Sequence, residues 1–126
     1  MLGDTKAFSG FAVDDLQRAR QFYQETLGLN TTVMDEENGV MAINHAADRE
    51  TLVYVKPDFV PATYTVLNFQ IDDIDAAVDG LSERGVSFER YDGFDQDEKG
   101  VMRGNGPPIA WFKDPAGNIF SVIQES

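Results

Sequence analysis

The chain has 126 residues, of which 42% are hydrophobic and 11% aromatic, a composition that can fill an apolar core and argues against disorder. Its 22 Asp and Glu outnumber its 10 Lys and Arg, and the resulting net charge of −12 would repel the phosphates of a nucleic acid. There is no cysteine, which excludes disulfides, thiolate metal sites and thiol nucleophiles.

The apolar runs are far shorter than a membrane span, and the first residues lack the cationic and apolar stretches of a secretory signal. We therefore expect a cytoplasmic protein with no membrane partner. Asp and Glu are spread along the whole chain, which favours a role in solubility. Attraction of a cationic ligand is the alternative interpretation of this acidic surface.

The first predicted strand and the residues after it recur in the second half of the chain. Phe8–Leu16 aligns with Val66–Ile74, and Phe11 matches Phe69. Apolar residues alternate at the start of each copy, as in a strand with one buried face. An Asp-Asp pair then follows in each copy, and its carboxylates can accept hydrogen bonds from the free amides of a starting helix.

A helix is predicted after each of these strands. Gly28 and Gly85 stand where a left-handed cap would end the two helices. The apolar stripes are Leu16, Ala19, Phe22, Tyr23 and Leu27 in the first helix, and Ile74, Ala77, Val78 and Leu81 in the second.

Short strands and turns fill the rest of each half. Two prolines in Lys56–Thr63 indicate a linker, and Asp114–Gly117 has the Pro and Gly positions of a tight turn. The predicted strands are Asn30–Met34, Val40–Asn44 and Leu52–Val55 in the first half, and Ser87–Tyr91, Val101–Arg103, Ile109–Phe112 and Ile119–Gln124 in the second.

Each half therefore has the order β-α-β-β-β, and such a unit is too small to close a core alone. We expect an α+β protein in which two βαβββ modules, at about residues 5–58 and 64–124, form one domain over residues 1–126. The modules would build a curved mixed β-sheet with helices outside it.

This arrangement resembles the vicinal-oxygen-chelate superfamily, the glyoxalase, bleomycin resistance and dioxygenase group, from about Phe8 to Gln124. Val13–Leu29, with its Phe-Tyr pair and Leu-Gly-Leu ending, looks like the first strand and helix of that family. Ile71–Val78 looks like the second copy, and Trp111–Asn118 like the closing hairpin. These motifs are specific for a fold and leave the activity open, since the family includes isomerases, lyases, dioxygenases and drug-sequestering proteins.

In metal-dependent members of that family, four inward side chains hold a divalent ion. The resemblance places the first-strand positions at Phe8 and Val66, and one closing-strand position at Ser121. The other falls near Leu52 to Tyr54, with Val53 as the preferred residue. Apolar side chains cannot ligate a cation and a lone serine is a poor ligand, so the resemblance implies the fold without a metal and without a cofactor.

Other chemical signals in the chain are weak. His45, the single histidine, is predicted to be exposed in a polar turn between two strands. The serines lack an evident base, and the Gly-rich segment Gly100–Pro108 lacks the Gly-Lys-Ser/Thr of a phosphate loop. The acidic run Asp92–Glu98 fits a solvated loop, with attraction of a cation at a cavity rim as the less favoured alternative.

Aromatic side chains are the remaining candidates for a binding site. The candidate ligand pocket comprises Phe8, Val66, Ser121, Trp111 and Arg103. Several of the other aromatic residues must belong to the core, because a sheet packed on helices buries alternate residues. The aromatic set as a whole is Phe8, Tyr54, Tyr64, Phe69, Phe94, Trp111 and Phe120.

Two main hypotheses of function remain. The first is a metal-free protein that binds a small, cationic or aromatic molecule in the cavity of the sheet, as the sequestering bleomycin resistance proteins do. The alternative is a glyoxalase-like lyase or isomerase, or another metal-independent enzyme of the family, which would need an inward general base. A collapsed pocket serving only as an interaction module is the third. The resemblance also implies a homodimer.

Overall fold

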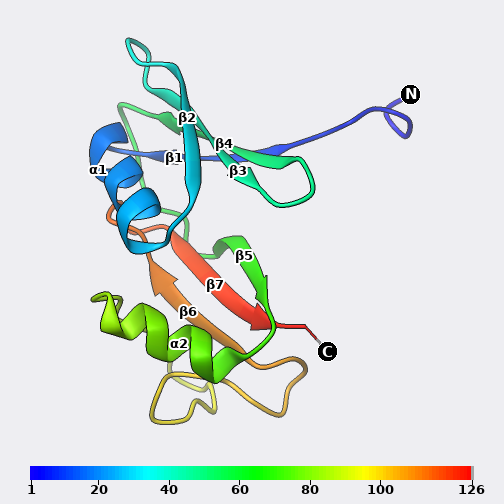
Figure 1. The fold of residues 1–126 in the computed structure, drawn as a ribbon, viewed down its shortest axis with the longest axis vertical. Coiled ribbons are helices and arrows are strands. Elements are labelled where there is room, and N and C mark those ends of the chain that lie inside the picture. Colours follow the sequence, from blue (N-terminus) through cyan, green and yellow to red (C-terminus); the bar gives the residue numbers. More distant parts are fainter. Residues whose placement is uncertain (126) are drawn as a thin grey trace. The chain divides into compact units, whose positions relative to one another are not determined.

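The computed structural model describes residues 1–125, which divide into two compact units, unit 1 (Met1–Val60) and unit 2 (from Pro61 onward). The division falls inside the segment predicted to be a linker. Each unit contains one mixed sheet and one helical segment, which confirms the expected α+β class (Figure 1). That the two modules act as one domain stays a prediction.

Unit 1 has the order β1 (Ser9–Val13), α1 (Leu16–Gln21), η1 (Phe22–Thr26), β2 (Asn30–Asp35), β3 (Val40–His45) and β4 (Arg49–Val55). Its sheet has the strand order β1-β4-β3-β2, in which β1 runs parallel to β4 and the other pairs are antiparallel. Most core residues of this unit lie on alternate positions of its strands and on α1 and η1. They are Phe11, Val13, Leu16, Ala19, Tyr23, Met41, Ile43 and Val53. The small Ala42 is also buried, between two of them on β3.

Unit 2 has the order β5 (Thr65–Ile71), α2 (Ile74–Glu83), β6 (Ile109–Lys113) and β7 (Ile119–Gln124). Its sheet has the order β5-β7-β6, with β5 parallel to β7 and β6 antiparallel to it. The helix α2 packs on β6 and β7 (Figure 1). Phe69 and Phe112 each make an edge contact with Phe120 along that side, and Val78 of α2 is buried.

The aspartates of the repeat cap both helices, as the sequence predicts. Asp15 Oδ1 accepts a hydrogen bond from the Arg18 amide at 3.1 Å, and Asp73 Oδ1 accepts one from the Ala76 amide at the same distance. The predicted glycines end the helices with a left-handed backbone, with φ of 70° at Gly28 and 91° at Gly85.

The first helix widens before it ends. The backbone amide of Leu27 donates to the Phe22 carbonyl five residues earlier, so Phe22–Thr26 is π-helical. Tyr23 is fully buried, while Phe22 and Leu27 of the predicted apolar stripe are only half-buried. A regular 3.6-residue period therefore describes the start of this helix but not its last turn.

Two predicted strands of the second half are wrong. Ser87–Tyr91 and Val101–Arg103 contribute only single bridges, Phe88 to Phe112 and Met102 to Gln96 and Ile109. Side chains, in place of a neighbouring strand, bind the backbone amides and carbonyls of this segment. The Gln96 side chain binds the backbone of Tyr91, Glu89 and Gly100. The Asp97 carboxylate accepts from the backbone amides of Lys99 and Val101. We call residues 89–103 the bridging loop.

We expect Asp73→Ala to lower the free energy of unfolding by about 1 kcal/mol, because the amide of Ala76 loses its cap. Urea denaturation followed by circular dichroism measures this. Asp72→Ala, which changes the exposed neighbour, is the matched control and should stay within about 0.5 kcal/mol of the parent chain. Equal losses in the two variants would contradict the assignment of the cap.

Candidate functional site

The two faces of the sheet in unit 2 differ in what covers them. Directly paired residues of neighbouring strands point to the same face of a sheet. Phe112, Phe120 and Val122 belong to the face that packs under α2. The residues between them therefore point to the opposite face, which we call the helix-free face.

The helix-free face carries a row of three cross-strand neighbours. Asn68 of β5 pairs with Ser121 of β7, and Ser121 pairs with Trp111 of β6. The Ser121 hydroxyl, which is fully buried, donates to Asn68 Oδ1 at 2.5 Å. This bond fixes the Asn68 amide, whose residue is exposed and can present its NH₂ group to a ligand.

An aromatic cluster covers Trp111 at one end of this row. The Tyr91 and Trp111 rings meet edge to face with centroids 5.7 Å apart, and Phe94 lies 5.4 Å from Trp111 and 5.6 Å from Tyr91. Trp111 is 8% exposed and Phe94 47% exposed. The bridging loop reaches this position because the Glu89 amide donates to the Trp111 carbonyl at 2.8 Å. The cluster offers both a buried and an open aromatic surface.

The Tyr91 hydroxyl lies inside this cluster. Its oxygen is buried and has no hydrogen-bond partner among the described residues. Burial, and secondarily the negative charge of Glu89, raise the pKa of Tyr91 above its ordinary value, so the hydroxyl keeps its proton at neutral pH.

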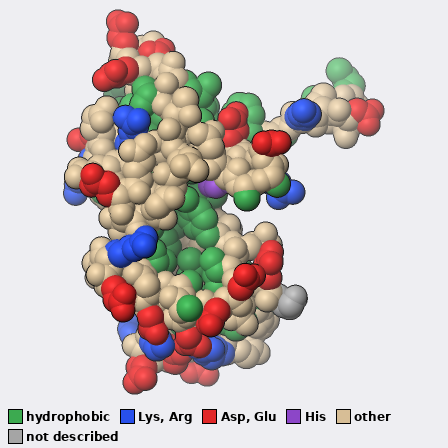
Figure 2. Space-filling model, in the orientation of Figure 1, with side chains coloured by type: hydrophobic (Ala, Val, Ile, Leu, Met, Phe, Trp, Pro, Cys, Tyr) green, Lys and Arg blue, Asp and Glu red, His purple; other side chains and the backbone are tan. Residues whose placement is uncertain are grey.

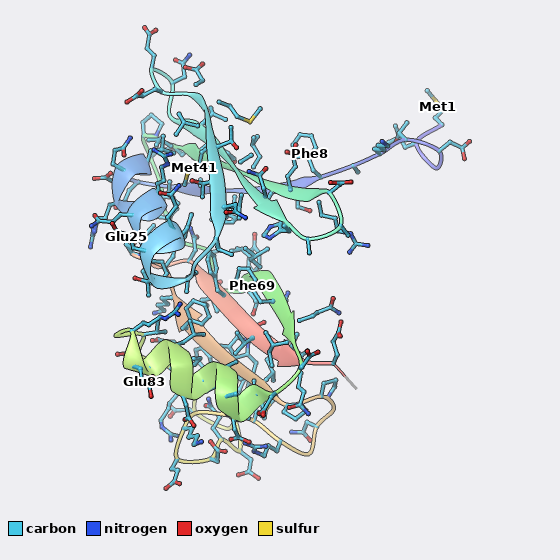
Figure 3. All side chains as sticks on the ribbon, viewed as in Figure 1. Met1, Phe8, Glu25, Met41, Phe69 and Glu83 are labelled. Carbon is cyan, nitrogen blue, oxygen red and sulfur yellow. The ribbon has the colours of Figure 1, made fainter. Side chains whose placement is uncertain are left out.

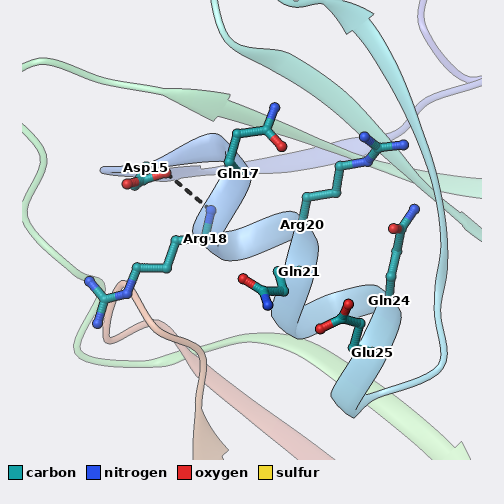
Figure 4. Close-up of a pocket in the computed structure, with 7 residues that line it drawn as sticks. All are labelled: Asp15, Gln17, Arg18, Arg20, Gln21, Gln24 and Glu25. Atoms are coloured by element: carbon teal, nitrogen blue, oxygen red, sulfur yellow. Dashed lines mark hydrogen bonds between the residues drawn. The ribbon is translucent and has the colours of Figure 1, made fainter.

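One surface hollow borders the helix-free face, and a second hollow lies elsewhere, on the first helical segment. A cavity of about 360 Å³ is lined by Gln70, Pro107, Ile123, Gln124 and Glu125, and the paired residues Gln70 and Ile123 share the helix-free face with Asn68 and Ser121. Another, of about 390 Å³, lies among the exposed polar side chains of α1 and η1 (Figure 4). The second hollow is a groove between long polar side chains of one helical segment and its N-cap Asp15, and none of its described lining residues is apolar or aromatic.

The sequence-predicted pocket residues fall in different places. Trp111 and Ser121 are neighbours on the helix-free face. Val66 is half-buried at the irregularity of the β5–β7 pairing, between Thr65 and Leu67. Phe8 belongs to unit 1, where it immediately precedes β1 and is 63% exposed (Figure 3).

Arg103 is held by carboxylates. Its guanidinium binds Asp75 of α2 at 2.8 Å and Asp97 of its own loop at 3.2 Å. Lys99 adds contacts to Asp75 at 3.5 Å and to Asp79 at 3.1 Å. These side chains are 34 to 58% exposed, so the pairs contribute little stability, but they tie the bridging loop to α2.

The positions that bind metal in the family do not fit a divalent ion in this chain. In the structure, Gly10 pairs with Leu52 as Asn68 pairs with Ser121, so the closing-strand position of the first module is Leu52, and the preferred choice of Val53 was wrong by one residue. Side chains alternate faces along a strand, and Val53 points into the core. Phe8, Leu52 and Val66 offer no ligand atom, and Ser121 is engaged with Asn68. In residues 1–125 no three His, Asp or Glu side chains gather as ligands would.

His45 lies at the end of β3 and is half-buried, so its predicted place in an exposed turn was wrong. The reason is the β3–β4 pairing, which extends to His45 and Arg49 and leaves only Ala46–Asp48 in the turn. His45 Nε2 lies 2.8 Å from the buried Thr51 hydroxyl. Burial lowers the pKa of His45.

Asn68, Tyr91 and Gln96 are residues that the sequence interpretation missed. Asn68 could have been found from the repeat, because the alignment places this polar side chain opposite Gly10, which has no side chain. Tyr91 and Gln96 had no such signal, since the segment that carries them forms no regular strand, whereas β2 and β3 follow the helix of the first module.

A profile of the Glyoxalase/Bleomycin resistance protein/Dioxygenase superfamily matches residues 7–122. No curated protein matches the chain significantly. No helix in residues 1–125 has the length and apolar character needed to cross a membrane.

Solved structures with this fold include TnmS3, an antibiotic binding protein from Streptomyces sp. CB03234, which is 26% identical, has a TM-score of 0.73 and covers 98% of each chain. A superfamily member from Sphaerobacter thermophilus is 23% identical, with a TM-score of 0.72 and coverage of 95% of this chain and 98% of its own. Lactoylglutathione lyase from Agrobacterium tumefaciens is 19% identical, with a TM-score of 0.65 and coverage of 97% and 95%.

We expect the free energy of unfolding to fall as the pH decreases from about 7 to 5, with His45 as its main cause. Because the folded pKa lies below the unfolded one, the unfolded chain binds more protons between the two values, and protonation favours unfolding. Urea denaturation across this range measures the slope, and His45→Gln should flatten it. An unchanged slope in the variant would show that another group titrates.

Asn68→Ala should lower the free energy of unfolding by about 1–3 kcal/mol, because the buried Ser121 hydroxyl loses its acceptor. Ser121→Ala should cost less, since the exposed Asn68 amide can turn to water. The double variant should resemble Ser121→Ala, as measured by urea denaturation. Additive losses in the double variant would show that the two side chains do not depend on each other.

Proposed function

The chain belongs to the Glyoxalase/Bleomycin resistance protein/Dioxygenase superfamily, and we propose that it binds a small, flat aromatic molecule on the helix-free face of unit 2 without using a metal ion. The observation that carries the proposal is the aromatic cluster of Tyr91, Phe94 and Trp111 beside the Asn68–Ser121 pair.

Apolar contact supplies the affinity in this proposal. Phe94 leaves about half of its surface open to solvent beside the nearly buried Trp111. A flat ring that stacks on Phe94 and Trp111 would remove this apolar surface from water and gain ring–ring contacts. The cavity that borders Gln70 and Ile123 gives room for the rest of the molecule on the same face.

Polar groups and charge set the orientation and the class of ligand. The fixed amide of Asn68 offers a donor on the edge strand β5, next to the central strand β7. Around Phe94, the bridging loop carries Asp92, Asp95 and Glu98, and acidic side chains are prominent on the side of unit 2 that Figure 2 shows. Because negative charge beside aromatic faces attracts cations, we propose a cationic aromatic ligand.

The comparison with TnmS3 supports binding as the function, since that protein is described as an antibiotic binding protein and aligns over 98% of both chains. The lyase alternative requires an acid or base at the reacting atoms. The positions that ligate metal in the family supply neither an acid nor a base here. They are occupied by Phe8, Leu52, Val66 and Ser121. Binding therefore takes precedence over catalysis.

The resemblance to the family also suggests further contact residues, an oligomeric state and a cellular location. Val66 of β5 is proposed to contribute apolar surface to the site, Phe8 of unit 1 stays a proposed ligand contact, and the chain is proposed to act as a homodimer in the cytoplasm. Sedimentation of the purified protein measures the oligomeric state directly.

The experiment that tests this function uses Trp111, the single tryptophan of the chain, as a fluorescent reporter. We expect an anthracene that carries a trimethylammonium group to quench Trp111 and saturate in the micromolar range. Anthracene sulfonate, the anionic counterpart, should bind at least about tenfold more weakly because of the acidic loop.

Phe94→Ala should weaken binding of the cationic anthracene about three- to tenfold, as expected for one ring contact. Tyr64→Ala, which removes an exposed ring outside the cluster, is the matched control and should leave the affinity unchanged. No quenching of the parent chain by the cationic probe up to about 1 mM, or equal losses in the two variants, would reject the proposed site.

A further inference from the structure

The Tyr91 hydroxyl is a buried polar group without a hydrogen-bond partner among the described residues. Such groups are rare in folded proteins, because burial removes the bonds to water that the group makes when exposed. A binding site is one place where this cost has a function, since a ligand atom can supply the missing bond.

The surroundings of Tyr91 keep this hydroxyl in a fixed place. The Tyr91 amide donates to Gln96 Oε1 at 2.9 Å, and Gln96 Nε2 donates to the carbonyls of Glu89 and Gly100 at 2.9 and 2.7 Å. The ring is held edge to face against Trp111 and Phe94. The hydroxyl is therefore positioned by the loop backbone and by the two rings that the proposed ligand would contact.

The hydroxyl acts as a donor. The pKa of Tyr91 is raised by burial and by Glu89, so the proton stays on the oxygen at neutral pH. The bond that satisfies it thus needs an acceptor on the ligand, such as a carbonyl oxygen.

We propose that Tyr91 is a specificity-determining residue whose hydroxyl donates a hydrogen bond to an acceptor atom on the aromatic ligand, and that the ligand is a flat aromatic compound bearing a ring carbonyl. This rests on the proposed function. Phe94 lies against Tyr91, is the most exposed ring of the cluster and follows Gly93, whose φ is 85°. On binding, Phe94 turns outward from Tyr91 and stacks on the outer side of the ligand.

The test compares an anthraquinone and an anthracene that carry the same trimethylammonium side chain. The two probes share shape and charge and differ in the carbonyl acceptors. With the parent chain, we expect the anthraquinone to bind about five- to tenfold more tightly than the anthracene, measured by calorimetry and by Trp111 fluorescence. With Tyr91→Phe, the affinity for the anthracene should be unchanged and the preference for the anthraquinone should disappear.

The same variant gives a second readout without a ligand. Tyr91→Phe removes an unpartnered hydroxyl, so its Tm should equal that of the parent or rise by up to about 4 °C. A lowered Tm would mean that the hydroxyl has a partner in the free protein, such as a bridging water, and would overturn the proposal.

The outcomes separate this inference from the proposed function. Equal binding of both probes by the parent chain, or a preference that survives in Tyr91→Phe, would overturn the role of Tyr91 and leave the site intact. If neither probe binds the parent chain, the proposed site fails, and the role of Tyr91 fails with it.

Discussion

The parallel pairing of β5 with β7 is the contact on which the candidate site depends. It joins residues about fifty positions apart in the chain and sets Asn68 beside Ser121. Since β7 is the central strand, the same register places Trp111 of β6 on the other side of Ser121. A shift of β5 by one residue against β7 would turn Asn68 toward the α2 side and leave Ser121 without its acceptor, so the polar pair shares a face with Trp111 only because this pairing is fixed.

The two units show how one strand–helix–strand pattern carries different chemistry. At equivalent places in the register, unit 1 has Gly10 beside Leu52, and unit 2 has Asn68 beside Ser121. A side chain at Gly10 would come within 2.9 Å of the Leu52 carbonyl, so the first pairing admits only glycine without a shift. The scaffold is thus retained, while its side chains do not fit the metal that the superfamily often uses.

The sequence contained enough to predict most of the fold and part of the site. The aspartate caps, the two glycine caps and the Asp114–Gly117 turn follow local rules, and the structure has all of them, with the Gly117 amide donating to the Asp114 carbonyl at 2.9 Å. The strands predicted at the two ends of the bridging loop do not form, because Gln96 and Asp97 hold its backbone through side-chain bonds. Tyr91 and Phe94 lie on that loop, so their approach to Trp111 could not be predicted from spacing.

The helix-free face of unit 2 is the proposed ligand surface. Nuclear magnetic resonance of the isotope-labelled chain, titrated with the cationic anthracene, locates the binding surface directly. We expect the shifted signals to include the Trp111 indole, the Asn68 side-chain amide and the backbone amides of Phe94 and Ser121. Shifts confined to the polar groove of α1, or signals of the helix-free face that do not move at saturation, would contradict this proposal.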